Sequence, residues 1–334
     1  MMRKITVLTL CAVLFALCVS DEAQQPAKVF RLGIATSRIE ASKPGPQVEA
    51  FHQKLRDLGY LEGNNILIEY RFLEGRPDVY SKLAVELVGR KVDVLVIFGS
   101  LPAIRAAKQA TKTIPIVIVT TQDPVATGII DSLARPGGNI TGVTTLQREL
   151  SGKRLELLKE AVPGISRVVA LVSETQLGKG PDTANDFQWY EAPAQALKIS
   201  LQQLALRGPN PDFEGAFQAA SKGRASALIT VAGSLLNPYQ KKIADLAIKN
   251  RLPSMHERSD YVEVGGFLSY SASDAESARR AAVYVDRILK GTKPADLPVE
   301  QPTKFDFVIN LKTTKQLGLT IPPDVLARAT KIIR

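Results

Sequence analysis

The chain has 334 residues, of which 45% are hydrophobic and 23% charged, a composition typical of globular proteins and unlike that of disordered or membrane-embedded ones. A chain of this length is longer than one ordinary hydrophobic core can accommodate, which predicts two domains. The formal net charge of +10 would suit a nucleic-acid-binding protein, but the basic residues are scattered in pairs such as Lys241-Lys242, without a basic tract or zinc-finger spacing. We therefore expect a solvated basic surface and no nucleic-acid partner.

The first residues have the pattern of an export signal. Arg3 and Lys4 precede an apolar run over residues 5–19, and polar residues follow from Asp21. The run is short for a bilayer span, which favours a secretory signal peptide at residues 1–23 over the alternative, a short membrane anchor. This predicts a periplasmic protein from which the signal has been removed.

The two cysteines, Cys11 and Cys18, both lie inside this predicted signal. The exported chain would therefore contain no thiol. That excludes disulfides, cysteine nucleophiles and thiolate metal sites.

The first half of the remaining chain alternates apolar runs rich in Val and Ile with segments of helical period. Strands are expected at Val29–Thr36, Ile66–Phe72, Val92–Phe98 and Ile114–Thr121, and helices at Val48–Leu58, Val79–Gly89 and Pro102–Ala110. The Val92–Phe98 run is almost continuously apolar, as in a strand covered on both faces. Such alternation predicts a parallel, doubly wound sheet.

The same alternation restarts after the Pro- and Gly-rich residues 135–139. Strands are expected at Arg167–Val172, Ser200–Leu206 and Ala227–Val231, and helices at Gly152–Ala161, Asn185–Leu197, Asp212–Ser221, Asn237–Lys249 and 273–290. Asn237 is expected to cap its helix, and Ser273 with Glu276 to form a capping box. The pattern predicts two α/β lobes joined near residues 140–146, followed by a proline-rich, extended tail.

The residues offer little for catalysis. Only His52 and His256 titrate near neutral pH; His52 is expected at the surface, and His256 is a candidate to line a cleft. One histidine forms neither a metal site nor a catalytic triad, and phosphate-binding or hydrolase motifs do not occur. We therefore expect no cofactor, no metal and no enzymatic activity.

The expected strand ends carry small polar residues instead. In open α/β sheets, ligands bind beyond the carboxyl ends of the strands, where helix N-termini offer free N–H groups. The candidate ligand-binding residues at these ends are Ser37, Ser100, Thr121 and Asp123 in the first half and Glu174 and Ser234 in the second. The alternative for each is a simple cap or turn, above all for Asp123, which precedes Pro124.

Five segments resemble the substrate-binding proteins of ABC importers, specifically the tryptophan/tyrosine-type family. They are Leu55–Asp78, Asp123–Thr144, Gly152–Val172, Gly265–Tyr270 and Arg287–Pro322, and the resemblance extends from about Phe30 to the end. It implies a type I periplasmic-binding fold, in which two doubly wound lobes are joined by a three-segment hinge. The crossings are expected near Gly142–Thr145, Gly266–Ser271 and Pro302–Phe305. The N-terminal lobe would then comprise residues 27–143 and 270–301, and the C-terminal lobe residues 146–266 and 305–334.

The resemblance also implies a function. We expect a solute-binding protein that captures a small organic ligand by hinge closure, with an amino acid or an aromatic carboxylate as candidates. Tyr270, beside a crossing, would offer the ligand an aromatic face and a hydroxyl. The permease and ATPase would be separate chains, and the receptor a monomer. An exported sensory receptor and a secreted enzyme on the same scaffold are the alternatives.

Two stretches, residues 35–47 and 175–190, look particular to this chain. Both would flank the cleft, so the ligand is not inferred from the family's named members. Trp189 and Tyr190 could stack on an aromatic ligand, although packing within the second lobe is the preferred interpretation.

Overall fold

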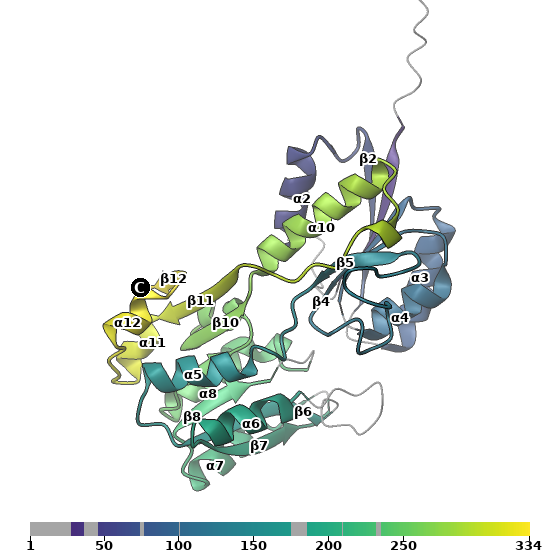
Figure 1. Ribbon diagram of the computed structural model, residues 1–334. Helices are drawn as coiled ribbons and strands as arrows, with labels where there is room; N and C mark the ends of the chain where they lie inside the picture. The colour runs from purple at the N-terminus through teal and green to yellow at the C-terminus, as the bar shows by residue number, and fades with distance from the viewer. Residues whose placement is uncertain are drawn as a thin grey trace, which may run out of the picture.

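The computed structural model describes residues 28–36, 46–73, 77–99, 101–174, 186–208, 210–231 and 235–334. They form two α/β lobes that are joined by three chain segments (Figure 1). Within these ranges, none of the helices has the length and hydropathy needed to cross a membrane. The α/β architecture with two lobes agrees with the expectation from the sequence.

The N-terminal lobe is built on a parallel sheet with strand order β2-β1-β3-β4-β5. Its strands are β1 (Phe30–Thr36), β2 (Ile66–Phe72), β3 (Val94–Phe98), β4 (Ile116–Thr120) and β5 (Ile140–Thr144). Helices α2 (Pro46–Asp57) and α10 (Asp274–Leu289) cover one face, and α3 (Pro77–Gly89) and α4 (Leu101–Ala110) cover the other. Because β3 packs against helices on both faces, all five of its residues are buried, which explains its continuous apolar run.

The C-terminal lobe is built on a sheet with strand order β12-β11-β10-β9-β8-β6-β7, in which only the β10–β11 pair is antiparallel. Its strands are β6 (Arg167–Ser173), β7 (Ser200–Leu206), β8 (Ala227–Thr230), β9 (Ser254–His256), β10 (Leu268–Ala272), β11 (Phe305–Asn310) and β12 (Lys331–Ile333). Helices α5 (Ser151–Ala161), α6 (Gln188–Ala196) and α12 (Pro323–Ala327) pack on one face; α7 (Phe213–Lys222), α8 (Gln240–Lys249) and α9 (Ser259–Glu263) pack on the other.

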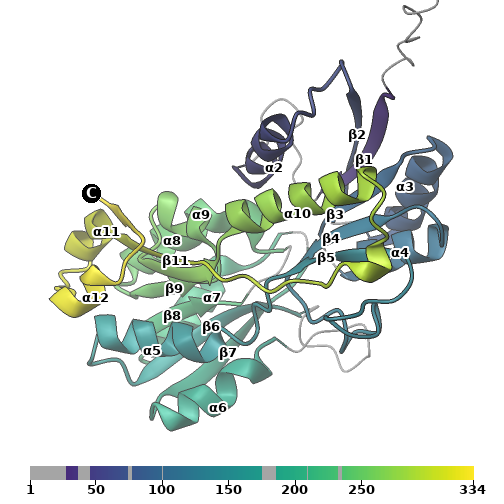
Figure 2. The ribbon, with the colours of Figure 1, turned by 45° about the horizontal axis from the view of Figure 1, so that its top comes forward.

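The chain passes between the lobes three times. It leaves the N-terminal lobe after β5 and enters α5, returns from β10 into α10, and passes back through residues 301–304 into β11. In Figure 2, α10 runs across the N-terminal lobe, although it follows a strand of the other sheet. Residues 270–272, which the sequence suggested for the N-terminal lobe, belong to β10 and pair with β11 in the C-terminal sheet.

Three local expectations are wrong. The Ser273 side chain makes no capping hydrogen bond to α10, and the backbone N–H of Ser273 instead donates to the Lys304 carbonyl (3.1 Å). Asn237 lies inside the short 3₁₀ helix η2 (Asn237–Tyr239), which precedes α8, and does not cap it. The tail is not simply extended, because it forms α11 (Leu311–Gln316), α12 and β12.

Two residues with unusual backbone geometry lie in β5 and directly after it. Gly142 has φ +142°, and a Cβ there would lie 2.1 Å from the carbonyl oxygen of Ile118 on β4. Leu146, two residues after β5, has φ +41°, which is uncommon for a residue with a side chain. Only glycine at position 142 lets β5 pair so closely with β4. The first connection between the lobes starts from this strand and then passes through Leu146, whose backbone is strained.

Candidate ligand-binding site between the lobes

Strand carboxyl ends from both sheets meet the connecting segments. After β4, the Thr121 carbonyl accepts a hydrogen bond from the backbone N–H of Gln147 in the first connection (3.1 Å). After β9, Glu257 contacts Arg154 of α5 (3.2 Å). Arg258 lies 3.8 Å from Asp274, the first residue of α10 in the other lobe. We call residues 145–150, 273 and 301–304 the hinge, and the strand ends beside it the candidate site.

The seven residues predicted from the sequence have different outcomes. Ser37, Ser100 and Ser234 lie outside the described residues, so the structure does not place them. Thr121 is exposed at the end of β4. Asp123 acts as a turn cap, since its Oδ1 accepts hydrogen bonds from the backbone N–H groups of Val125 (2.8 Å) and Ala126 (3.2 Å).

The remaining two predicted residues are in the C-terminal lobe. Glu174 is 51% exposed and forms an ion pair with Arg207 (3.0 Å). Tyr270 is half-buried in β10, with its ring stacked on Phe305 at 5.7 Å between centroids and edge-on to Phe307. Within the described part of the chain, no hydrogen bond involves the Tyr270 hydroxyl. Thr121 and Tyr270 thus lie beside the hinge, whereas Glu174 is occupied by a surface ion pair.

A buried arginine at the hinge was missed by the sequence analysis. The side chain of Arg154 on α5 is 0% exposed, and its Nη1 donates to the Gln147 carbonyl (2.8 Å), the Tyr190 hydroxyl (3.4 Å) and Glu257 Oε1 (3.2 Å). Its Nη2 donates to Gln147 Oε1, and its Nε to the Tyr270 carbonyl (2.8 Å). Arg154, Leu158 and Ala161 share helical spacing on the buried face of α5, and this spacing was the available signal.

Tyr190 belongs to the same cluster. Its side chain is 1% exposed, and its hydroxyl donates to Glu257 Oε1 (2.8 Å). Burial, together with the charge of Glu257, raises the pKa of the phenol, so Tyr190 stays protonated as a donor. Tyr190 therefore packs inside the C-terminal lobe, as preferred from the sequence, while its neighbour Trp189 is 39% exposed.

Gln122 is a second residue that the sequence analysis missed. It follows β4, and its backbone carbonyl accepts a hydrogen bond from Thr144 Oγ1 at the end of β5 (2.8 Å). Its side-chain oxygen is buried and has no hydrogen-bond partner among the described residues. An unpaired buried amide oxygen beside the hinge is an available acceptor for a ligand N–H group.

The side chains of both histidines are hydrogen-bonded within the lobes. His256 is fully buried, its ring nitrogens contact Thr230 Oγ1 (3.1 Å) and Ser254 Oγ (2.8 Å), and burial lowers its pKa to about 3. It stacks on Tyr261 and does not line a cleft. His52 is half-buried and hydrogen-bonded to the Tyr70 hydroxyl, where we expected a surface residue. Burial lowers its pKa as well.

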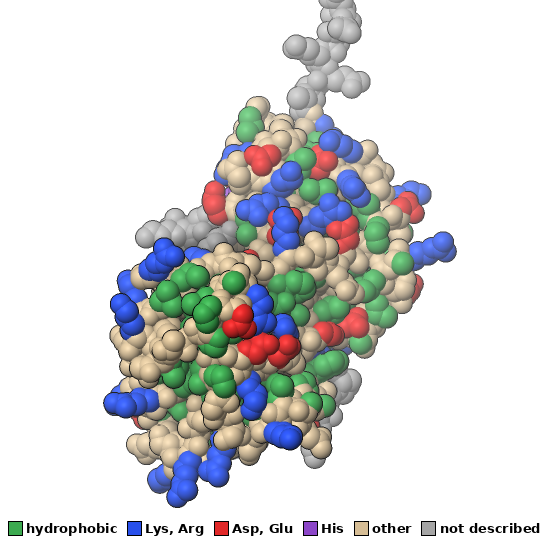
Figure 3. Space-filling model, turned by 60° about the vertical axis from the view of Figure 1, so that its left-hand side comes forward, with side chains coloured by type: hydrophobic (Ala, Val, Ile, Leu, Met, Phe, Trp, Pro, Cys, Tyr) green, Lys and Arg blue, Asp and Glu red, His purple; other side chains and the backbone are tan. Residues whose placement is uncertain are grey.

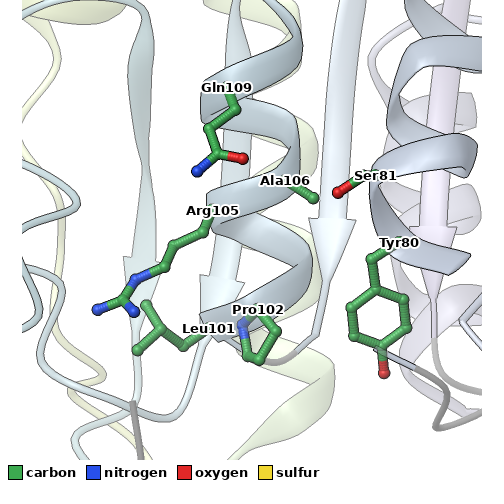
Figure 4. Close-up of a pocket in the computed structure, with 7 residues that line it drawn as sticks. All are labelled: Tyr80, Ser81, Leu101, Pro102, Arg105, Ala106 and Gln109. Atoms are coloured by element: carbon green, nitrogen blue, oxygen red, sulfur yellow. The ribbon is translucent and has the colours of Figure 1, made fainter. Parts of the chain in front are cut away.

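No cluster of three His, Cys, Asp or Glu residues within the described ranges could hold a metal ion. A cavity of about 240 Å³ lies between α3 and α4, and none of the residues that line it belongs to the hinge (Figure 4). Its lining comprises Tyr80, Ser81, Leu101, Pro102, Arg105, Ala106 and Gln109. The Arg105 guanidinium already donates to the Thr127 carbonyl (3.2 Å), and the four described residues among the predicted site residues, Thr121, Asp123, Glu174 and Tyr270, do not line this cavity.

Two doubly wound lobes joined by three segments, with strand carboxyl ends beside the connections, define the type I periplasmic-binding fold. The family described as ABC transporter substrate binding protein matches residues 39–333. The chain belongs to this family, which confirms the resemblance found in the sequence.

Three similar proteins match most of the length of this chain. The tyrosine-binding protein of Clostridioides difficile is 25% identical over 276 residues, which cover 81% of this chain and 76% of that protein. A conserved domain protein from Vibrio cholerae has a solved structure with a TM-score of 0.79 and 27% identity, covering 91% of this chain and 100% of the other. An ABC domain from Streptococcus pneumonia in complex with L-Trp also reaches 0.79, at 22% identity, covering 92% of this chain and 100% of the other.

Proposed function

We propose that this protein is the extracytoplasmic receptor of an ABC importer, which captures a small organic ligand between its lobes and closes around it. The observation that carries the proposal is the hinge, where strand ends of both lobes meet three connecting segments. A ligand that contacts both lobes shifts an existing equilibrium between open and closed forms toward the closed one. The receptor would deliver the ligand to a permease and an ATPase on separate chains.

The proposed ligand is an aromatic amino acid or an aromatic carboxylate. The names of the similar proteins support this class, because one is a tyrosine-binding protein and another is in complex with L-Trp. In this chain, Tyr270 offers an aromatic ring beside the hinge, and Gln122 offers an unpaired acceptor. We include Ser37, Ser100 and Ser234, which lie outside the described residues, in the proposed site.

The proposal includes export and a non-catalytic role. Residues 1–23 would be removed as a signal peptide, and the mature protein would act as a periplasmic monomer. Both histidines are engaged in core contacts, which supports binding without chemistry. On one face of the molecule, Lys and Arg side chains are interspersed with Asp and Glu over both lobes (Figure 3), which does not favour a polyanionic partner.

A thermal-shift screen of the mature chain tests the ligand class. L-tyrosine, L-tryptophan and benzoate would be compared with aliphatic amino acids and sugars, and binding of any of them raises the melting temperature. At 100 times the dissociation constant, the gain is about 2.7 kcal/mol. A shift with aliphatic compounds alone would contradict the aromatic class.

Small-angle scattering with the compound found in that screen tests closure. The radius of gyration is expected to fall on saturation, and an unchanged value would contradict capture by closure. Uptake of the radiolabelled compound by cells with and without the gene separates an importer from a sensory receptor, because only loss of the importer protein abolishes uptake.

A further inference from the structure

Arg154 contacts the first connection of the hinge and the strand that leads into the second connection. It lies on α5, which packs on the C-terminal sheet, and its side chain is fully buried. Gln147, which accepts two of its hydrogen bonds, belongs to the first connection; Tyr270, which accepts a third, lies in β10, three residues before Ser273 of the second connection. One guanidinium therefore links α5 to the first connection and to the strand that precedes the second connection.

The third connection joins the same group through an aromatic contact. The Tyr270 ring stacks on Phe305, the first residue of β11, at an interplanar angle of 14°. Phe305 follows directly on residues 301–304. Where each of the three connections joins the C-terminal lobe, a residue in or next to it therefore contacts Arg154 or Tyr270.

The charge of Arg154 is balanced inside the protein. Glu257 at the end of β9 lies 3.2 Å away, and Tyr190 donates to the same carboxylate oxygen. A planar guanidinium presents five N–H donors in a fixed fork, so it can bond several acceptors at once where lysine cannot. A buried ion pair contributes little net stability compared with apolar packing. We therefore infer that Arg154 serves to hold its acceptors in fixed positions.

Gln147 is held from both lobes. Its backbone N–H donates to the Thr121 carbonyl in the N-terminal lobe, while its own carbonyl and side chain accept from Arg154 in the C-terminal lobe. The preceding residue, Leu146, has φ +41°. A strained residue next to a fixed one is the arrangement expected where backbone rotation is concentrated.

We propose that Arg154 is the positioning residue of the hinge: together with the β10–β11 pairing, it keeps Gln147 and Tyr270 fixed to the C-terminal lobe and confines rotation to the residues before Gln147 and after Ala272. The inference rests on the proposed function, because a receptor that closes on its ligand needs a defined axis. Tyr270 then moves with the C-terminal lobe as one rigid wall of the site.

The test measures the distance between the lobes without any ligand. A chain beginning at residue 24 contains no cysteine, so spin labels can be attached at Val85→Cys on α3 and Gln218→Cys on α7, both exposed helix positions. The labelled protein is compared with Arg154→Met/Glu257→Gln, which removes both charges, and with Arg154→Lys, which keeps the charge and loses the fork.

Both variants are expected to broaden the interlobe distance distribution. Amide exchange in residues 145–150 and 268–273 should accelerate by about tenfold, since the local opening that precedes exchange becomes easier. The matched control is Tyr60→Phe, which deletes a buried hydrogen bond to Asp286 (3.0 Å) inside the N-terminal lobe. It should lower stability and leave the distances unchanged.

Unchanged distances and exchange in the folded double variant would overturn the proposal. If the double variant does not fold, Arg154→Lys decides the question by the same two measurements. Broadened distances in a protein for which no ligand is found would support Arg154 as the positioning residue and contradict the proposed function. Failure of the inference and failure of the proposed function are therefore distinguishable.

Discussion

Replacing Gly142 with alanine is expected to damage the β4–β5 pair from which the first connection starts. An added Cβ would lie 2.1 Å from the carbonyl oxygen, 2.6 Å from the nitrogen and 2.9 Å from the carbonyl carbon of Ile118. Contacts below 3.0 Å do not occur at real Cβ atoms, and these neighbours are backbone atoms that cannot rotate away. The strands must therefore separate by about an ångström, which weakens their ladder.

The expected cost follows from what the separation breaks. Gly142 pairs with Ile118 near the middle of the β4–β5 ladder, and its carbonyl also accepts a hydrogen bond from the Glu300 backbone N–H (3.0 Å). Losing two or three buried backbone hydrogen bonds, each of about 1 kcal/mol net, and adopting φ +142° with a side chain give a total of roughly 3–5 kcal/mol.

Urea denaturation of Gly142→Ala and Gly138→Ala measures this cost against a matched control. Gly138 also has a left-handed φ of +66°, but a Cβ there meets no atom within 4 Å. Its replacement should therefore cost only about 1 kcal/mol, from backbone strain alone. Equal losses in the two variants would refute the steric argument, because strain without close contact would then explain both.

Three other predictions concern two buried rings and one half-buried ring. Tyr190→Phe should lower the free energy of unfolding by about 1–2 kcal/mol in urea denaturation, because Glu257 loses a buried donor; an unchanged value would mean that another group replaces the phenol. The pKa of His256 is about 3 in the folded protein against 6.5 when unfolded, so its stabilising effect is complete above pH 6.5 and declines as the pH falls toward 3. We expect a loss of roughly 2 kcal/mol at pH 5 that is absent from His256→Gln, and parallel pH profiles would contradict this. Tyr270→Ala should weaken binding of L-tyrosine or L-tryptophan about tenfold in calorimetry while Tyr270→Phe retains most of it, and equal affinities would place the ligand elsewhere.

Local patterns in the sequence predicted most strands well. Ile66–Phe72 and Ser200–Leu206 coincide with β2 and β7. In β2 the isoleucine and aromatic residues are visible without knowledge of the partner strands. The family match also confirms the resemblance and the fold. What the sequence did not show depends on contacts between distant segments.

The position of β10 is one such case. Tyr270 pairs with Phe307, so the strand is fixed by a partner 37 positions later and not by its own pattern. Arg154 is another, since its five acceptors come from Gln147, Tyr190, Glu257 and Tyr270, none of which is a neighbour on its helix. Of the candidate site, the sequence indicated Tyr270 and Thr121, and it also raised the turn cap that Asp123 forms, because Asp123 precedes Pro124.

The packing of α10 on α2 determines when the N-terminal lobe can finish folding. The apolar face of α10, with Ala278, Ala281, Ala282 and Val285, covers the same core as Phe51 and Leu55, yet more than two hundred residues of chain separate the two helices. During synthesis, the face of β1–β5 that α2 shares with α10 therefore remains only partly covered until residue 289 has emerged. Contacts of such long sequence separation slow folding and prolong the exposure of apolar surface. A fragment that ends at residue 272 would keep that face partly exposed, so neither lobe can be obtained by cutting the chain once.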